Sequence, residues 1–194
     1  MAFDHPFYFL RHGETTWNAN RRTQGQLNSP LSDRGWEQAR AAGQALRDEP
    51  IERIIASPLD RAFFTAQEVG KVKGIEVVFD RELMECHLGE LQDGPHGPWL
   101  AQYFEGTFDP PGGEPFGEFC ERVWTAMQRA VAKGPNTLIV AHGGLWLAAR
   151  QFVTVDPDQK RMPNALPLHV TPSSARWEHR ICGGVTPAAS SEAY

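Results

Sequence analysis

The sequence predicts an α/β fold, a three-layer sandwich in which helices flank a mostly parallel central sheet. Short apolar runs of strand character alternate along the chain with longer segments of helical period, and this order is typical of parallel strands joined by helical crossovers. A length of 194 residues suits one domain. We expect that domain over residues 1–182, with an irregular, lid-like insert at about 86–115, and a disordered tail over 183–194.

The first half of the chain supplies three expected strands and two expected helices. Apolar runs predict buried strands at 7–10, 53–56 and 76–79. Ser32 is the expected N-cap of a helix over 33–48. Ser57 and Pro58 are expected to be the N-cap and the first residue of a helix that ends near Gly74.

The second half begins with the insert, which is rich in glycine and proline. A long irregular segment in a compact domain usually has a function, such as covering a site. The expected helices are 99–104, 116–132 and 144–153. The expected strands are 136–141 and a closing hairpin of 168–171 with 175–181.

Composition limits the classes of protein to which the chain can belong. A net charge of -5 argues against a general nucleic-acid surface, and no apolar stretch approaches the length of a membrane span. The N-terminus lacks the regions of a signal peptide, so we expect a cytoplasmic protein. Three widely spaced cysteines indicate neither a disulfide framework nor a zinc site. We predict no metal and no cofactor.

Two of the expected strands end in a histidine that is followed by glycine. Arg11, His12 and Gly13 follow the first strand, and His142 and Gly143 follow a later one. In open α/β sheets, ligands bind at the carboxyl ends of the strands. One such histidine is more often structural, but two of them, with an arginine beside one, predict a shared phosphate site.

The predicted site draws on four separated segments. They read Leu-Arg-His-Gly-Glu-Thr-Thr-Trp-Asn, Ala-Ser-Pro-Leu-Asp-Arg-Ala, Glu-Leu-Met-Glu and Val-Ala-His-Gly-Gly. They contribute Arg11, His12, Asn18, Arg61, Glu85 and His142. In this order and spacing, over residues 7–150, they resemble the histidine phosphatase superfamily, whose fold is phosphoglycerate mutase-like. Gln24 and Gly25, in a Gln-Gly-Gln phrase, extend the resemblance, so we expect a catalytic domain of this type.

The resemblance implies that His12 is a nucleophile that forms a phosphohistidine. Only neutral imidazole attacks, and neighbouring guanidinium groups disfavour the protonated ring. Glu85 is implied to protonate the leaving alcohol and then to activate water. Taken alone, Glu85 could be an exposed loop acid; taken with the other segments, it is the expected proton donor.

The other residues are expected to bind the phosphate group. Arg11 and Arg61 carry planar guanidinium groups that match phosphate oxygens better than lysine would. The remaining expected ligands are Asn18, Gln24, Gly25, His142 and the backbone N–H of Gly143.

The superfamily contains phosphatases, mutases and members that mainly bind partners. Mutases are similar to this chain at Glu85, His87 and Gly89, but they have an arginine and a tyrosine where this chain has Cys86 and Leu88. The insert has no arginine or lysine that could bind the carboxylate of a phosphoglycerate. We therefore expect a metal-independent phosphomonoester hydrolase that acts on a small phosphorylated metabolite, with no nucleic-acid or membrane partner.

Three alternatives are open, namely mutase-type phosphoryl transfer, metal-dependent hydrolysis, and a non-catalytic module that binds a phospho-ligand or a protein. Gly144, where mutases tend to have asparagine, argues against the first, and the lack of a ligand-spaced cluster argues against the second. Retention of both His12 and Glu85 argues against the third. Aromatic residues of the insert, such as Trp99 and Phe104, suit an apolar leaving group or simply pack the insert. The sequence implies no particular oligomeric state.

Overall fold

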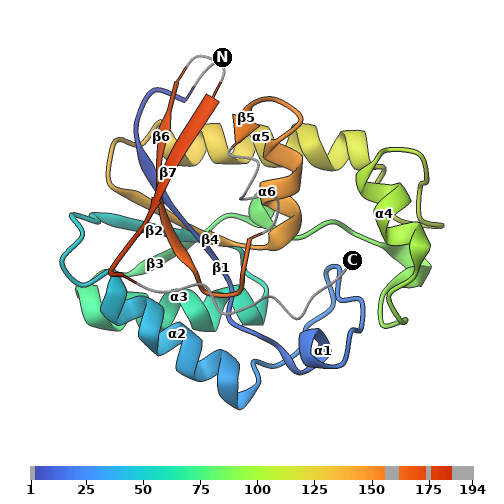
Figure 1. The fold of residues 1–194 in the computed structure, drawn as a ribbon, viewed down its shortest axis with the longest axis horizontal. Helices are drawn as coiled ribbons and strands as arrows, with labels where there is room; N and C mark the ends of the chain where they lie inside the picture. The colour runs from blue at the N-terminus through green and yellow to red at the C-terminus, as the bar shows by residue number, and fades with distance from the viewer. Residues whose placement is uncertain (1–2, 156–161, 174–175, 185–194) are drawn as a thin grey trace.

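A central sheet organises the residues that the computed structural model describes, which are 3–155, 162–173 and 176–184 (Figure 1). The strands are β1 (Phe7–Arg11), β2 (Arg53–Ala56), β3 (Val77–Phe79), β4 (Thr137–Ala141), β5 (Thr154–Val155), β6 (Pro167–Pro172) and β7 (Arg176–Ile181). They form a seven-stranded sheet in the order β3-β2-β4-β1-β6-β7-β5. β1 to β4 run parallel, whereas β6 pairs antiparallel with β1 and β7. The prediction of a mostly parallel sheet is confirmed.

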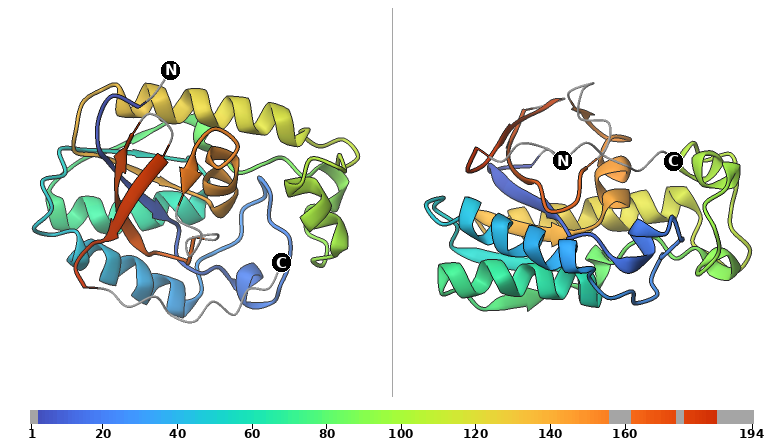
Figure 2. Two further views of the ribbon diagram at one scale, coloured as in Figure 1. Left: turned by 45° about the horizontal axis from the view of Figure 1, so that its top comes forward. Right: turned by 60° about the horizontal axis from the view of Figure 1, so that its bottom comes forward.

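Helices cover both faces of this sheet. The helices are α1 (Thr16–Ala19), α2 (Asp33–Ala45), α3 (Asp60–Lys73), α4 (Pro98–Phe104), α5 (Phe116–Val131) and α6 (Gly143–Ala149), with short 3-10 turns η1 (Arg81–Leu83) and η2 (Gly89–Leu91). Figure 2 shows α2 and α3 side by side on one face. Apolar residues of α5 and α6 pack on the other face. The predicted three-layer sandwich is therefore the observed fold.

Alternation along β1 explains why the sheet is enclosed on both faces. Phe7 and Phe9 belong to the core shared with α5 and α6, whereas Tyr8 and Leu10 belong to the core shared with α2 and α3. All four side chains are buried. Successive side chains of a strand point to opposite faces, so a continuous apolar run requires a helical layer on each side.

The start of α3 differs from the prediction. α3 begins at Asp60 after Leu59, which makes no side-chain capping bond. Ser57 is not the N-cap, because its backbone N–H donates to the Val140 carbonyl (3.0 Å) and so extends the pairing of β2 with β4. Its hydroxyl instead contacts His142. The serine that was predicted to cap a helix lies at the sheet edge.

Two predicted helices end earlier in the structure than in the sequence. The helix expected over 33–48 ends at Ala45, because the Arg47 N–H donates to the Gln44 carbonyl in a tighter turn (3.1 Å). The helix expected over 144–153 is α6, which ends at Ala149. Two further elements, α1 and β5, are short and were not predicted from the sequence.

The insert lies at one end of the molecule, beside the N-terminal end of α5 (Figure 1). It contains η2 and α4, and α4 contributes the buried Tyr103, whose ring lies 5.4 Å from that of Phe116. Within the described residues, no helix combines the length and apolarity needed to span a membrane. Most of the predicted tail, residues 185–194, lies outside the described residues.

Candidate active site

The carboxyl ends of three neighbouring strands bring the two histidines together. The His12 N–H donates to the Ala141 carbonyl at the end of β4 (3.0 Å). The rings of His12 and His142 lie 5.3 Å apart, centre to centre. Because β1, β2 and β4 are parallel, the residues that follow them meet at one edge of the sheet, as the sequence predicted.

A pocket opens at this edge. It is lined by eight of the nine predicted site residues, namely Arg11, His12, Asn18, Gln24, Gly25, Arg61, Glu85 and Gly143. His142 is not among the lining residues; it is fully buried behind His12. The structure therefore brings the four predicted segments together, with His142 set back from the opening.

The His12 ring is held in one tautomer. Its Nδ1 lies 2.7 Å from the Gly13 carbonyl, which can only accept, so Nδ1 carries the proton and Nε2 keeps its lone pair. Burial, followed by the charges of Arg61 and Arg11, lowers the pKa of His12 well below its usual range. The ring is therefore neutral at pH 7, as an attacking nitrogen must be.

Gly13 allows this arrangement because the chain passes very close to α2. A Cβ atom at Gly13 would collide with the Gly35 carbonyl oxygen. The Gly13 N–H donates to Thr65 Oγ1 on α3 (3.0 Å). Both helices of one layer thus fix the turn that follows His12.

His142 has one partnered and one unpartnered nitrogen. Its Nε2 lies 2.7 Å from Ser57 Oγ. Its Nδ1 is buried and has no hydrogen-bond partner among the described residues. Burial, together with Arg61 and His12, lowers the pKa of His142 well below its usual range. A buried polar atom without a partner in a native fold calls for a ligand or water.

The arginine side chains are held by backbone carbonyls. Arg11 donates to the Met162 carbonyl (2.8 Å), and Arg61 donates to the carbonyls of Gly25 (2.6 Å) and Leu27 (2.9 Å). Both arginines are buried. Neutral acceptors orient the guanidinium groups without cancelling their charge, which suits the binding of an anion.

Asn18 and Gln24 share an anchor at Thr15. Asn18 Oδ1 accepts from the Thr15 backbone N–H (3.1 Å), which closes the capping box of α1, and Gln24 Oε1 accepts from Thr15 Oγ1 (2.9 Å). Asn18 therefore has a structural role in addition to its place on the pocket wall.

The Glu85 carboxylate is held by two backbone amides. Its Oε1 accepts from the Cys86 N–H (3.1 Å) and its Oε2 from the Gly144 N–H (3.1 Å). A Cβ atom at residue 144 would collide with Oε1. Glycine at this position therefore lets the start of α6 approach and hold the carboxylate.

The insert supplies an apolar wall. Leu88, Leu100 and Phe104 line the pocket with His96, whereas Tyr103 is wholly buried in the core. Cys86 also lines the pocket, but burial raises the pKa of its thiol well above the usual range, so it is not a thiolate. Some of the predicted aromatic residues thus face the pocket, and others pack the insert.

Sequence reasoning missed several residues of this site. Asn164 lines the pocket and its amide donates to the His12 carbonyl (2.9 Å), but it follows no strand and lies in no recognisable phrase. Arg122 on α5 contacts the backbone of Glu85, and nothing in the helical pattern distinguishes it from a surface arginine. Ser57 could have been found, since it follows a strand at the same sheet edge.

Comparisons with known proteins agree with this geometry. The sequence model of the histidine phosphatase superfamily (branch 1) matches residues 7–178. A probable phosphoglycerate mutase GpmB of Serratia proteamaculans is 38% identical over 147 residues, covering 70% of this chain and 68% of the relative. A mycobacterial glucosyl-3-phosphoglycerate phosphatase, solved in complex with VO3, has a TM-score of 0.79 and 31% identity, covering 91% of this chain and 98% of that chain.

A third protein shares the fold at lower identity. The α-ribazole phosphatase of Shigella flexneri has a TM-score of 0.77 at 24% identity, covering 92% of this chain and 96% of that chain. The family match spans most of the chain and includes every segment that lines the predicted site. The chain belongs to the histidine phosphatase superfamily, branch 1.

Proposed function

We propose that this protein hydrolyses a small phosphomonoester through a phosphohistidine intermediate. The observation that carries the proposal is that His12 and Glu85 line one pocket, whose insert wall is largely apolar and has no arginine or lysine. A neutral imidazole, a carboxylate and two buried arginines are the groups that such a reaction requires.

In the first step, His12 Nε2 attacks phosphorus and the ester P–O bond breaks. Glu85, in its acid form, gives its proton to the departing alcohol oxygen. Arg11 and Arg61 stabilise the charge on the outer phosphoryl oxygens. A proton on His142 Nδ1 would let that buried nitrogen donate to one of the same oxygens, which would give it a partner.

In the second step, water attacks the phosphohistidine and the N–P bond breaks. The Glu85 carboxylate takes a proton from that water, which restores its acid form, and the electron pair of the broken bond returns to His12 Nε2. Inorganic phosphate leaves. Splitting one displacement into two allows a single carboxyl group to act as acid and then as base.

Mutase-type phosphoryl transfer is the second candidate, because the curated relative from Serratia proteamaculans is named a probable phosphoglycerate mutase. The other cations of the pocket favour hydrolysis instead. Besides Arg11 and Arg61, the pocket is lined by two arginines that already lie near carboxylates, Arg22 beside Asp93 (2.6 Å) and Arg34 beside Glu14 (3.6 Å). A phosphoglycerate would have to compete with these partners for a cation. Release of phosphate, rather than interconversion of 2- and 3-phosphoglycerate, is the expected outcome of an assay with both substrates.

A cytoplasmic location and independence from metal are further parts of the proposal. Within the described residues, no group of three or more His, Cys, Asp or Glu side chains is arranged to hold a metal ion. Activity measured in excess chelator tests the metal independence directly.

His12→Ala is expected to abolish both turnover and the trapping of a phosphoenzyme, because it removes the proposed nucleophile. The measurement is phosphate release from a panel of phosphomonoesters in excess chelator, with acid-quenched phosphoenzyme quantified in parallel. His169→Ala, which removes a histidine whose ring lies 4.8 Å from that of Tyr8 and which does not line the pocket, is the matched control and should keep full activity. Full activity in His12→Ala would end the proposal.

A further inference from the structure

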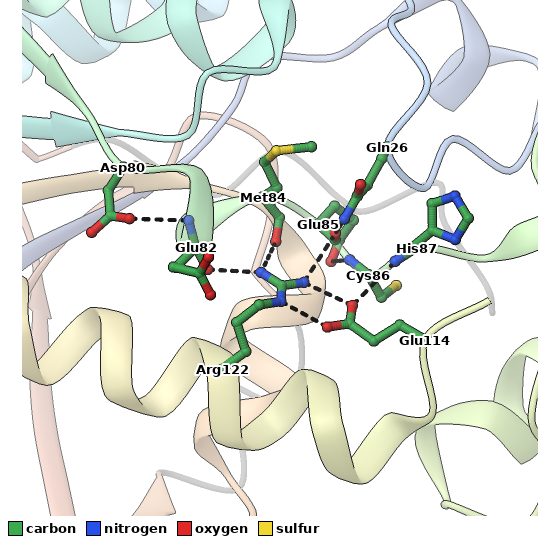
Figure 3. A network of polar contacts seen from close by, with 9 residues as sticks. All are labelled: Gln26, Asp80, Glu82, Met84, Glu85, Cys86, His87, Glu114 and Arg122. Carbon is green, nitrogen blue, oxygen red and sulfur yellow. Dashed lines mark hydrogen bonds and ion pairs between the residues drawn. The ribbon is translucent and has the colours of Figure 1, made fainter.

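Arg122 on α5 holds the backbone of Glu85 and of the residues just before it (Figure 3). One guanidinium nitrogen donates to the carbonyls of Glu82 (2.7 Å) and Met84 (3.1 Å), and another reaches the carbonyl of Glu85 (3.4 Å). Arg122 therefore contacts three carbonyls in a stretch of four residues. The rigid fork of arginine suits such a set of acceptors, whereas lysine offers only a compact charge.

Glu114 completes the arrangement from the other end of the insert. Its two carboxylate oxygens accept from Arg122 at 2.7 and 2.8 Å. One of them also accepts from the His87 N–H (3.3 Å), and the Glu114 N–H donates to the His87 carbonyl (2.7 Å). The ion pair is largely shielded, with 17% of the Arg122 and 16% of the Glu114 side chain exposed.

These contacts define the backbone path around Glu85 on both sides. Arg122 fixes the residues before it and the Glu85 carbonyl, and Glu114 fixes His87 two residues after it. The carboxylate then reaches the amides of Cys86 and Gly144. A small shift of residues 82–87 would lengthen the bond to Gly144, because that amide belongs to a separate element, α6.

We propose that Arg122, braced by Glu114, is a positioning residue that sets the Glu85 carboxyl group for proton transfer to the leaving alcohol. The inference rests on the proposed function, in which Glu85 is the proton donor. Arg122 contacts the backbone of this residue from outside the pocket and is not one of the lining residues, so it acts through Glu85 and not on the substrate.

Another arginine of the same helix provides a control of similar chemistry. Arg129 forms an ion pair with Asp80 (2.6 Å), whose side chain accepts from the Glu82 N–H and caps η1. Arg129→Met thus removes a contact between α5 and the same turn without releasing residues 84–87. An effect that came only from weaker packing of α5 on this turn should appear in both variants.

The test compares kcat/KM for an alkyl phosphate with kcat/KM for p-nitrophenyl phosphate, whose leaving group needs little protonation. Glu85→Gln sets the reference, since loss of the donor should slow the alkyl ester far more than the aryl ester. Arg122→Met is expected to slow the alkyl ester about 10- to 100-fold and the aryl ester less than about threefold, because small misplacement of a catalytic group is costly. Arg129→Met should leave kcat/KM unchanged for both esters.

Two further variants separate position from charge and from folding. Arg122→Lys keeps the charge but not the fork, and should show the same selective loss; full recovery would assign the effect to charge and overturn the positioning role. If Arg122→Met does not fold, Glu114→Gln replaces it in the test, because it is a smaller change. It should shift the alkyl-to-aryl ratio in the same direction. Equal losses on both esters in the folded variants would also overturn the positioning role of Arg122.

The outcomes for the two proposals are distinct. A wild-type enzyme that hydrolyses both esters, with an unchanged ratio in Arg122→Met and Glu114→Gln, refutes the positioning role and leaves the proposed function intact. A wild-type enzyme that hydrolyses no phosphomonoester refutes the proposed function, and the positioning role with it.

Discussion

The surroundings of the candidate site residues set the protonation state of His12 and the orientation of the two arginines. Burial and the charges of Arg61 and Arg11 keep His12 neutral, and backbone carbonyls orient the guanidinium groups of both arginines. The sequence identified eight residues that line the pocket, because they occupy recognisable phrases. It did not identify Arg122 or Asn164, whose contacts are made through the backbone of distant residues and leave no local pattern.

Gly144→Ala is expected to lower kcat/KM for alkyl phosphates by about 10²-fold, because the added methyl group would occupy the position of Glu85 Oε1. Gly117→Ala is the matched control: an added Cβ there meets nothing within 4 Å, and alanine favours the helix by up to about 1 kcal/mol. Steady-state kinetics and denaturant unfolding of both variants check this. Unchanged kinetics in Gly144→Ala would show that the carboxylate is not held at this amide.

The start of a helix matched the prediction where a local cap determines it, and differed where contacts with distant residues determine it. Ser32 caps α2 as predicted, since its hydroxyl accepts from the Gly35 N–H (3.0 Å). Ser57 has the same local signature, but strand pairing and His142 recruit it instead. A serine can make either contact, and only the folded sheet determines which one forms.

The turn after α2 is joined to the sheet by Glu49. Its carboxylate accepts from Tyr8 on β1 (2.9 Å) and from both terminal nitrogens of Arg180 on β7 (2.6 and 2.7 Å). The Arg180 side chain is 52% exposed, so solvent screens part of the interaction. The contact links one helix layer to two strands that are far apart in sequence.

Glu49→Gln is therefore expected to lower the free energy of unfolding by about 1 kcal/mol at pH 7, with no effect on the pocket. Urea denaturation measures the free energy of unfolding of this variant and of a control, Glu68→Gln. The control removes an ion pair with Lys71 on α3. The control should lie within about 0.5 kcal/mol of the wild type. If Glu49→Gln is equally neutral, the contact does not stabilise the layer.

At the scale of the whole molecule, the sequence predicted the α/β sandwich because the alternation of strands and helices leaves few other arrangements. It could not predict that β6 would pair antiparallel with β1, because nothing local to β6 specifies which edge of the sheet it joins. The position of the insert at one end of the molecule was also beyond the sequence, since its path is set by contacts with α5.

Two buried neutral histidines make the stability of the whole fold depend on pH. The pKa values of His12 and His142 are lowered in the folded protein, so the unfolded chain takes up protons first as the pH falls below about 6.5. The free energy of unfolding therefore keeps its full value above about pH 6.5. It falls as the pH drops from there towards the lowered pKa values of the folded protein. Each histidine should cost about 1.4 kcal/mol of unfolding free energy per pH unit in that window.

Denaturant unfolding at pH 7.5 and 5.5, in buffer without phosphate, measures this loss. His12→Asn should reduce the difference between the two pH values by about 1.4 kcal/mol, because one of the two proton-binding groups is removed. An identical difference in the variant would mean that folding does not lower the pKa of His12.

The ends of the insert are tied to each other by backbone hydrogen bonds, Glu114 to His87 (2.7 Å) and Glu90 to Pro111 (3.0 Å). An insert whose two ends are held together can change in length or composition at small entropic cost to the rest of the domain. The apolar wall that the insert gives to the pocket can therefore change in sequence without displacing the residues at the sheet edge.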